Sequence, residues 1–166
     1  MAEMNESIAI ARYYLTEMFG GQGDLSRLYD LFTSDAVSYG LDRQPVYGPE
    51  GQRQFIELLR GAFRDLQVTV EGTVANEAQV AVRFTVRGVH QGRLRDLAST
   101  GLLIVVPGNA IYRITGGKIT ESWTTFDVLG ISLGVGLVQV LERFLDVAQQ
   151  VEGGEEEDYF YRPRPS

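Results

Sequence analysis

The side chains that could do chemistry are few, and two of them stand at or near the ends of predicted strands. His90 is the only histidine in the chain, and its ordinary pKa lies close to neutral pH. It could transfer a proton or orient a ligand, or it could be a buried neutral histidine that holds the following turn by a hydrogen bond. Asp127 could act as a base if a cavity raised its pKa. Alternatively, its carboxylate caps the turn that follows it.

Further candidates lie on the last predicted strand and among the aromatic residues. Ser122 and Thr124 alternate with Trp123, so the two hydroxyl groups share one face of the strand and the indole lies on the other. We expect the hydroxyls to line a pocket and Trp123 to pack in the core or in an interface, or alternatively to stack on a ligand. The aromatic side chains that could line this pocket, or simply fill the core, are Tyr14, Tyr39, Phe84 and Tyr112.

Composition excludes several classes of protein. The 166 residues contain no cysteine and one histidine, so thiolate and multi-histidine metal sites are excluded, and we expect no metal. The net charge of −7 disfavours binding to nucleic acid. Without a signal peptide or a long apolar run, we expect a cytoplasmic protein that does not associate with a membrane.

The period of the apolar residues changes along the chain. Helical spacing predicts helices over residues 5–19, 24–32 and 49–64, the second capped by Asp24 and the third opened by Pro49. Alternating patterns predict strands over residues 37–39, 67–74, 79–90, 102–114 and 118–127, with Pro107-Gly108 marking a bulge or an edge irregularity. Within the strand 67–74, Val68, Val70 and Val74 should share one face.

These elements predict an α+β fold. The strands have one apolar and one polar face, as in antiparallel sheets that are covered on one side. Three N-terminal helices must therefore lie on the apolar face of a curved antiparallel sheet, which leaves a pocket between the two layers.

The C-terminal part differs from the rest. Residues 131–151 carry a strong helical stripe, which predicts an additional amphipathic helix that packs on its own domain, seals the pocket or meets a second subunit. Residues 152–166 are acidic and then rich in Arg and Pro, which predicts a flexible tail. The expected organisation is a domain over residues 1–130, a helix over 131–151 and a tail over 152–166.

Several motifs occur in an order that resembles a known family. They are GDL at 23–25, LFTSDAV at 31–37, GPEG at 48–51, GVHQG at 88–92 and GKITESW at 117–123, followed by Asp127 and Gly130. In this order the chain resembles the SnoaL-like polyketide cyclases. The resemblance implies the cone-shaped α+β fold shared with nuclear transport factor 2 and ketosteroid isomerase, and a homodimer formed through the outer face of the sheet.

The chain departs from this family at one important position. In the family, an acid typically follows the tryptophan of the last strand and acts as general acid or base, whereas this chain has Thr124 there. A threonine hydroxyl does not exchange a proton near neutral pH as a carboxylate does. The remaining proton carriers would be His90 and Asp127, with Ser122 and Thr124 orienting the substrate.

Three functions are therefore open at the level of the sequence. The first is an enzyme without a cofactor that binds a small hydrophobic molecule and transfers a proton next to a carbonyl, in an aldol-type cyclisation or an isomerisation. The second is a binding module that uses the same pocket but has lost the catalytic acid. The third is a structural dimerisation domain, for which a pocket filled by side chains would be the sign.

Overall fold

The computed structural model describes residues 1–95 and 97–127. The helix predicted over residues 131–151 and the tail predicted over 152–166 lie outside the described residues. No helix in the described part of the chain is long and apolar enough to cross a membrane.

Six strands form one sheet in the order β2-β1-β6-β5-β4-β3. The strands are β1 (Phe32–Tyr39), β2 (Val46–Tyr47), β3 (Phe63–Ala75), β4 (Gln79–His90), β5 (Leu103–Thr115) and β6 (Lys118–Phe126). All neighbouring pairs are antiparallel except β1 and β6, which run parallel. The predicted curved sheet is confirmed, with this one parallel pair that the alternating patterns could not predict, because alternation does not reveal strand direction.

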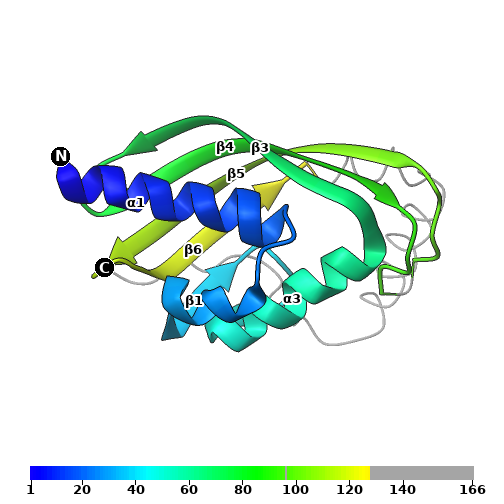
Figure 1. The fold of residues 1–166 in the computed structure, drawn as a ribbon, viewed down its shortest axis with the longest axis horizontal. Coiled ribbons are helices and arrows are strands. Elements are labelled where there is room, and N and C mark those ends of the chain that lie inside the picture. The colour runs from blue at the N-terminus through cyan, green and yellow to red at the C-terminus, as the bar shows by residue number, and fades with distance from the viewer. Residues whose placement is uncertain (96, 128–166) are drawn as a thin grey trace, which may run out of the picture. The chain divides into compact units, whose positions relative to one another are not determined.

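The helices lie on one side of this sheet (Figure 1). They are α1 (Ala2–Tyr13), a π-helix (Tyr14–Phe19), a 3-10 turn (Leu25–Arg27), α2 (Leu28–Leu31) and α3 (Gly48–Ala62). The carboxylate of Asp24 accepts the backbone N–H of Ser26 at 2.9 Å, which confirms the predicted cap. The segment 24–32 is shorter as a helix than predicted, because Phe32 already belongs to β1.

Aromatic side chains from both layers pack against one another between the helices and the sheet. Tyr14 contacts Phe32 and Tyr112 edge to face, with ring centroids 5.0 and 5.9 Å apart. Further along the sheet, Phe126 stacks on Phe19 at 6.1 Å and meets Phe84 edge to face at 5.9 Å. Aromatic pairs of this kind add stability beyond the apolar area that they bury.

A bulge in β3 overturns one predicted face. Val70 pairs with Phe84, but Gly72 pairs with the next residue, Arg83, so that β3 carries one extra residue. A single extra residue exchanges the two faces of a strand. Val74 is therefore 76% exposed instead of facing the core with Val68.

The irregularity predicted at Pro107-Gly108 is absent from the pairing of β5 with β4, which runs through both residues without a shift. The proline is tolerated for a different reason. Its carbonyl accepts the backbone N–H of Asp127, the residue after β6, whose last pair is Phe126 with Gly108. Since the N–H and C=O of one residue point to the same side of a strand, the missing N–H of Pro107 falls where β6 has ended.

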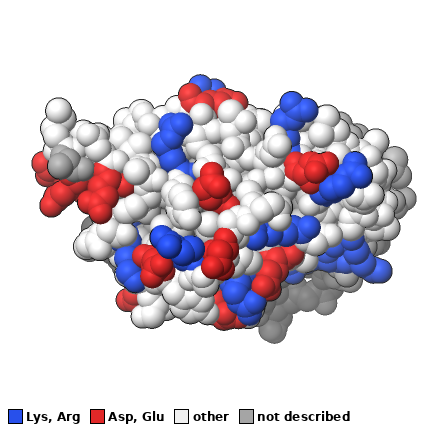
Figure 2. Space-filling view, in the orientation of Figure 1, with Lys and Arg blue, Asp and Glu red and all other residues white. Residues whose placement is uncertain are grey.

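Charged side chains of both signs are mixed on the face shown in Figure 2. On the outer face of the sheet, Arg83 forms an ion pair with Glu71 at 2.5 Å, and Arg113 pairs with Glu121. Much of the positive charge in the described region is thus neutralised by a neighbouring carboxylate.

Candidate functional site

Polar side chains that are buried in an apolar interior are the natural place to search for a site. Among the described residues, all but Thr124 fall into two groups at different levels of the sheet. The buried polar side chains are Ser38, Gln52, His90, Ser122 and Thr124.

The first group is a linear series of hydrogen bonds among four side chains, which we name the Tyr14–Ser122 chain. The phenol of Tyr14 donates to Oε1 of Gln52 at 2.8 Å, and Nε2 of Gln52 donates to Oγ of Ser38 at 2.6 Å. The hydroxyl of Ser122 donates to Ser38 at 2.7 Å. None of these four side chains is more than 2% exposed.

Four elements meet in the Tyr14–Ser122 chain. Tyr14 opens the π-helix, Gln52 lies on α3, and Ser38 and Ser122 face each other across the parallel pair of β1 and β6. Burial raises the pKa of Tyr14 above its ordinary value, and burial together with the neighbouring Tyr14 raises the pKa of Tyr112. Both phenols therefore stay protonated and can donate a hydrogen bond at any physiological pH.

Sequence reasoning found two members of this chain, Tyr14 and Ser122, and missed the other two. Gln52 comes one turn before Ile56, on the apolar stripe of α3. A polar residue on an apolar stripe indicates a buried polar side chain, and this signal could have identified Gln52 from the sequence. Ser38 is flanked by Val37 and Tyr39, so alternation already placed its hydroxyl on the face opposite to theirs.

The second group is His90 with its partner Thr100. His90 is the last residue of β4 and is fully buried. Its Nδ1 lies 3.2 Å from Oγ1 of Thr100, whereas Nε2 is buried and has no hydrogen-bond partner within residues 1–95 and 97–127. Burial lowers the pKa of His90 below its ordinary value. The imidazole is therefore neutral near pH 7, with one ring nitrogen still available to a ligand.

The surroundings of His90 are apolar. The ring of Phe63 lies 5.3 Å from the imidazole, centroid to centroid. Phe63 and Phe126 also pack against a small cluster formed by Ile104 and Val106, which is separate from the main core. We name these residues, with His90 and Thr100, the His90 site.

The two groups are far apart. Ser122 pairs with Tyr112 on β5, whereas the backbone N–H of His90 donates to the carbonyl of Leu102. Tyr112 and Leu102 are ten residues apart along the chain, which corresponds to about 30 Å along an extended strand. One small molecule could not contact both groups at the same time.

The other predicted site residues lie elsewhere. Asp127 is exposed, and its backbone N–H bonds to Pro107, about 17 Å along β5 from the level of His90. Thr124 and Phe84 are buried on the inner face, between the two groups. Tyr39 lies on the outer face, where it stacks on Trp123 with ring centroids 6.1 Å apart. The structure thus does not bring Asp127 or Tyr39 together with His90.

The backbone of Thr124 also explains why residue 40 is a glycine. Gly40 has φ of +80°, and a Cβ at this position would lie 1.9 Å from the carbonyl oxygen of Thr124. Only glycine allows this conformation and this close approach. The segment that follows β1 is therefore pressed against β6 at the position where the family typically carries its acid.

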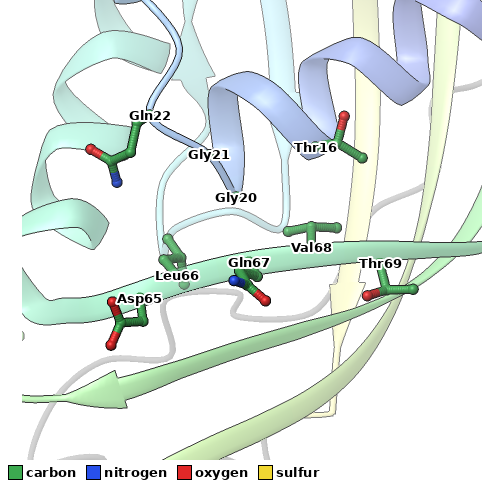
Figure 3. A pocket seen from close by; sticks show the side chains of 9 residues that line it. All are labelled: Thr16, Gly20, Gly21, Gln22, Asp65, Leu66, Gln67, Val68 and Thr69. Carbon is green, nitrogen blue, oxygen red and sulfur yellow. The ribbon is translucent and has the colours of Figure 1, made fainter.

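Two hollows open on the surface of the described part. The first, the β3 groove, has a volume of about 550 Å³ and lies between the end of the π-helix, with Gly20 and Gly21, and the edge strand β3 (Figure 3). Among the described residues that line it, Asp65 is the only charged one, and it lies at another irregularity of β3, between Arg64 and Gln67. Its carboxylate is exposed and pairs with Arg64 at 3.1 Å, so this groove offers little for catalysis.

The second hollow, the α3 groove, has a volume of about 480 Å³. One wall is the side of α3 that carries Phe55 and Leu58, and the opposite wall is formed by Pro45 and Val46. The ion pair between Arg95 and Asp42 lies at its rim. Neither groove is lined by His90 or by a member of the Tyr14–Ser122 chain.

Solved structures of known proteins share this fold. A candidate SnoaL-like polyketide cyclase from Jannaschia sp. CCS1 is 20% identical, with 81% of this chain and 94% of that chain covered and a TM-score of 0.74. IdmH from Streptomyces antibioticus, a candidate polyketide cyclase, is 27% identical, with coverage of 79% and 98% and a TM-score of 0.66. AclR from Streptomyces galilaeus, a candidate hydroxylase, is also 27% identical, with coverage of 90% and 96% and a TM-score of 0.69.

No curated relative matches the chain in sequence. The family description SnoaL-like polyketide cyclase, however, matches residues 10–133, which include both buried polar groups and all the described strands. Members of this family bind small molecules. The motif order, the curved six-stranded sheet and this match agree, and the chain belongs to the SnoaL-like polyketide cyclase family.

Proposed function

We propose that the chain binds a small hydrophobic molecule at the His90 site and transfers a proton at a carbon next to its carbonyl group. The observation that carries this proposal is the buried Nε2 of His90, for which the described part of the chain supplies no hydrogen-bond partner. A buried polar atom without a partner costs about 1–3 kcal/mol. A ligand that supplies a partner for Nε2 would recover this cost.

The neighbours of His90 support the role of a base. If Nδ1 carries the proton, its N–H donates a hydrogen bond to Oγ1 of Thr100, and Nε2 presents a lone pair to the ligand. The apolar side chains of Phe63, Ile104 and Val106 would surround the ring of a hydrophobic substrate and exclude water. In this proposal Asp127 does not act on the same carbonyl group, because it lies too far along the sheet.

Two similar proteins suggest two different reaction classes, cyclisation and hydroxylation. IdmH is a candidate cyclase and AclR a candidate hydroxylase, and both are 27% identical to this chain. The proposed cyclisation or isomerisation rearranges the substrate without adding oxygen, whereas a hydroxylation adds one oxygen atom. The mass of the product therefore distinguishes the two.

A second function is favoured by a specific observation at Thr124. The hydroxyl stands where the family typically has its acid, and this side chain is only 8% exposed. A binding module that carries or senses a ligand would need no acid there. In that case the unpartnered Nε2 of His90 would orient the ligand without exchanging a proton.

One experiment separates catalysis from binding. The bicyclic ketone 2-tetralone, whose C–H groups next to the carbonyl are weakly acidic, is incubated with the full chain in D₂O, and exchange is followed by proton NMR. We expect exchange that the His90→Gln variant slows by about 10²-fold or more, as for loss of a general base. The matched Asp127→Asn variant should exchange at the wild-type rate.

Each other result has a definite meaning. Thermal stabilisation by 2-tetralone without exchange would support the binding module. Exchange that persists unchanged in His90→Gln would refute the assignment of the base. A slower rate in Asp127→Asn alone would move the chemistry to the end of β6.

We also propose that two copies associate through the outer face of the sheet. On this face Leu103, Val105 and Ile111 are 54%, 49% and 40% exposed. Ile111 pairs with Trp123, so the apolar side chains continue onto β6. Light scattering should give the mass of a dimer, and Val105→Asp should give that of a monomer; a dimer in both would place the interface elsewhere.

A further inference from the structure

We propose that the α3 groove is a second binding site, which takes a small aromatic molecule with an anionic oxygen group, and that Arg95 binds the anion. The proposal does not depend on the function assigned to His90. At about 480 Å³ the groove lies within the range of small-molecule sites, about 300–1,000 Å³. A hollow of this size can hold a molecule of two or three aromatic rings.

The walls of the groove suit a flat apolar body. Phe55 and Leu58 project from α3 and are half-buried, so that part of each side chain remains available to a ligand. The ring of Phe55 is held in place by Phe19, with centroids 6.1 Å apart. Pro45 and Val46 form a second apolar wall that is also rigid, because Val46 belongs to β2. These walls favour an aromatic ring between them.

The carboxylate on the α3 side of the groove has no capacity left for a ligand. Glu50 accepts hydrogen bonds from Arg53 at 2.7 and 3.0 Å, from Gln54 at 3.0 Å and from the phenol of Tyr29 at 2.9 Å. These donors hold the pKa of Glu50 at about 2. A cationic ligand would therefore find Glu50 already fully occupied.

The guanidinium of Arg95 is in the opposite situation. It carries five N–H donors, and within the described residues its side chain makes a single hydrogen bond, to Asp42. Asp42 is itself fixed by the backbone N–H of Arg43 at 2.7 Å. Of the two carboxylates that line the groove, Glu50 is saturated, and Asp42 accepts one hydrogen bond at each oxygen, from Arg43 and from Arg95. The unused donors of Arg95 should therefore select a ligand with negatively charged oxygens.

The backbone places Arg95 at this rim at some cost. Arg95 has φ of +53°, in the left-handed region that side chains other than glycine disfavour. The turn is held by Nε of Arg93, which donates to the carbonyl of Arg95 at 2.8 Å, and by paired backbone bonds between Leu94 and Leu97 at 2.9 and 3.0 Å. Strained residues that their surroundings fix in this way cluster at ligand clamps.

The test uses two probes with the same apolar body and different charge. They are the anion 1-anilinonaphthalene-8-sulfonate and the neutral N-phenyl-1-naphthylamine, titrated into the full chain and followed by fluorescence. We expect Arg95→Gln to weaken the anionic probe about fivefold and to change the neutral probe by less than about twofold, as for one partly exposed ionic contact. Arg87→Gln is the matched control, because it removes the same charge from an exposed arginine on β4, outside the groove.

Location is tested separately. Gln54→Trp fills the groove from an exposed position on α3 and should abolish binding of both probes. Amide NMR shifts caused by the anionic probe should concentrate in residues 45–58 and at Arg95. The proposal is overturned if Arg87→Gln weakens the anion as much as Arg95→Gln does, if Arg95→Gln has no effect, or if the shifts lie away from the groove.

Discussion

The two buried polar groups of the interior differ in how completely their hydrogen bonds are made. In the Tyr14–Ser122 chain every side chain has a partner among the other three, and four elements of the fold are joined by it. At the His90 site one ring nitrogen has a partner and the other has none. His90 is as deeply buried as the four side chains of the Tyr14–Ser122 chain, so burial alone does not distinguish a structural group from a functional one.

This difference follows from where each group lies. The Tyr14–Ser122 chain lies among helices and central strands, where neighbouring elements supply donors and acceptors from several sides. His90 lies at the end of β4, and its ring contacts Phe63, which offers no polar atom. A satisfied buried network makes the fold more specific, whereas an unsatisfied group lowers stability and is retained where a ligand can complete it.

The largest effect should come from breaking the satisfied chain. In Gln52→Leu, the phenol of Tyr14 and the hydroxyl of Ser38 each lose a partner while they remain buried. Ser38 still accepts the hydroxyl of Ser122, whereas the phenol of Tyr14 is left without its acceptor. We expect the free energy of unfolding to fall by about 1–3 kcal/mol, the cost of one buried polar group without a partner. Urea unfolding measures it.

Gln54→Leu provides the control, because Gln54 lies two residues further along α3 and its side chain is exposed. This variant should stay within about 0.5 kcal/mol of the wild type. Equal losses in the two variants would mean that the Tyr14–Ser122 chain contributes nothing specific to stability.

The sequence predicted the fold better than the grouping of the polar side chains. Alternation in β4 located both faces of that strand, and Val80, Val82 and Phe84 are buried as predicted. The same rule failed at Val74, because a single bulged residue is invisible in the apolar pattern. Register and bulges depend on the neighbouring strand, and local spacing cannot supply them.

The candidate site was predicted in part for a related reason. The alternation of side chains along each strand correctly places His90 and Ser122 on the inner face, but it carries no information on distance along the sheet. The sequence therefore predicts one pocket for both residues, although ten residues of β5 separate their levels. Gln52 was missed because its two partners come from two other elements, the π-helix and β1, which only the folded chain brings together.

A change of pH between 8 and 5.5 should change the contribution of His90 to the free energy of unfolding and leave that of the Tyr14–Ser122 chain unchanged. Burial holds the pKa of folded His90 below its ordinary value of 6.5, whereas the phenol of Tyr14, the one titratable group of the Tyr14–Ser122 chain, has its pKa raised by burial and does not titrate in this range. Above about pH 7 the imidazole is neutral in both states. As the pH falls through 6.5, the unfolded chain binds a proton before the folded one does, so the free energy of unfolding falls, by at most about 1.4 kcal/mol per pH unit.

The measurement compares urea unfolding at pH 8 and pH 5.5 for the wild type and for His90→Leu. The chain has a single histidine, so the variant removes this titration entirely. Carboxylates that lose a proton near pH 4 act alike in both proteins and cancel in the difference. An identical pH dependence in both would mean that folded His90 titrates as it does in the unfolded chain.

Replacing His90 by leucine should have the smallest effect on stability among the variants of the two buried groups. At pH 8, His90→Leu removes a buried nitrogen that has no partner, and it replaces the ring with an apolar side chain beside Phe63. Thr100 is half-buried, so water can replace the lost bond to its hydroxyl. We expect the free energy of unfolding to stay within about 1 kcal/mol of the wild type, since exchanging an unpaired polar group for an apolar one is nearly neutral or stabilising. A loss as large as that of Gln52→Leu would show instead that His90 is held by the fold as tightly as the Tyr14–Ser122 chain, and the contrast between the two groups would no longer mark His90 as the place where a ligand binds.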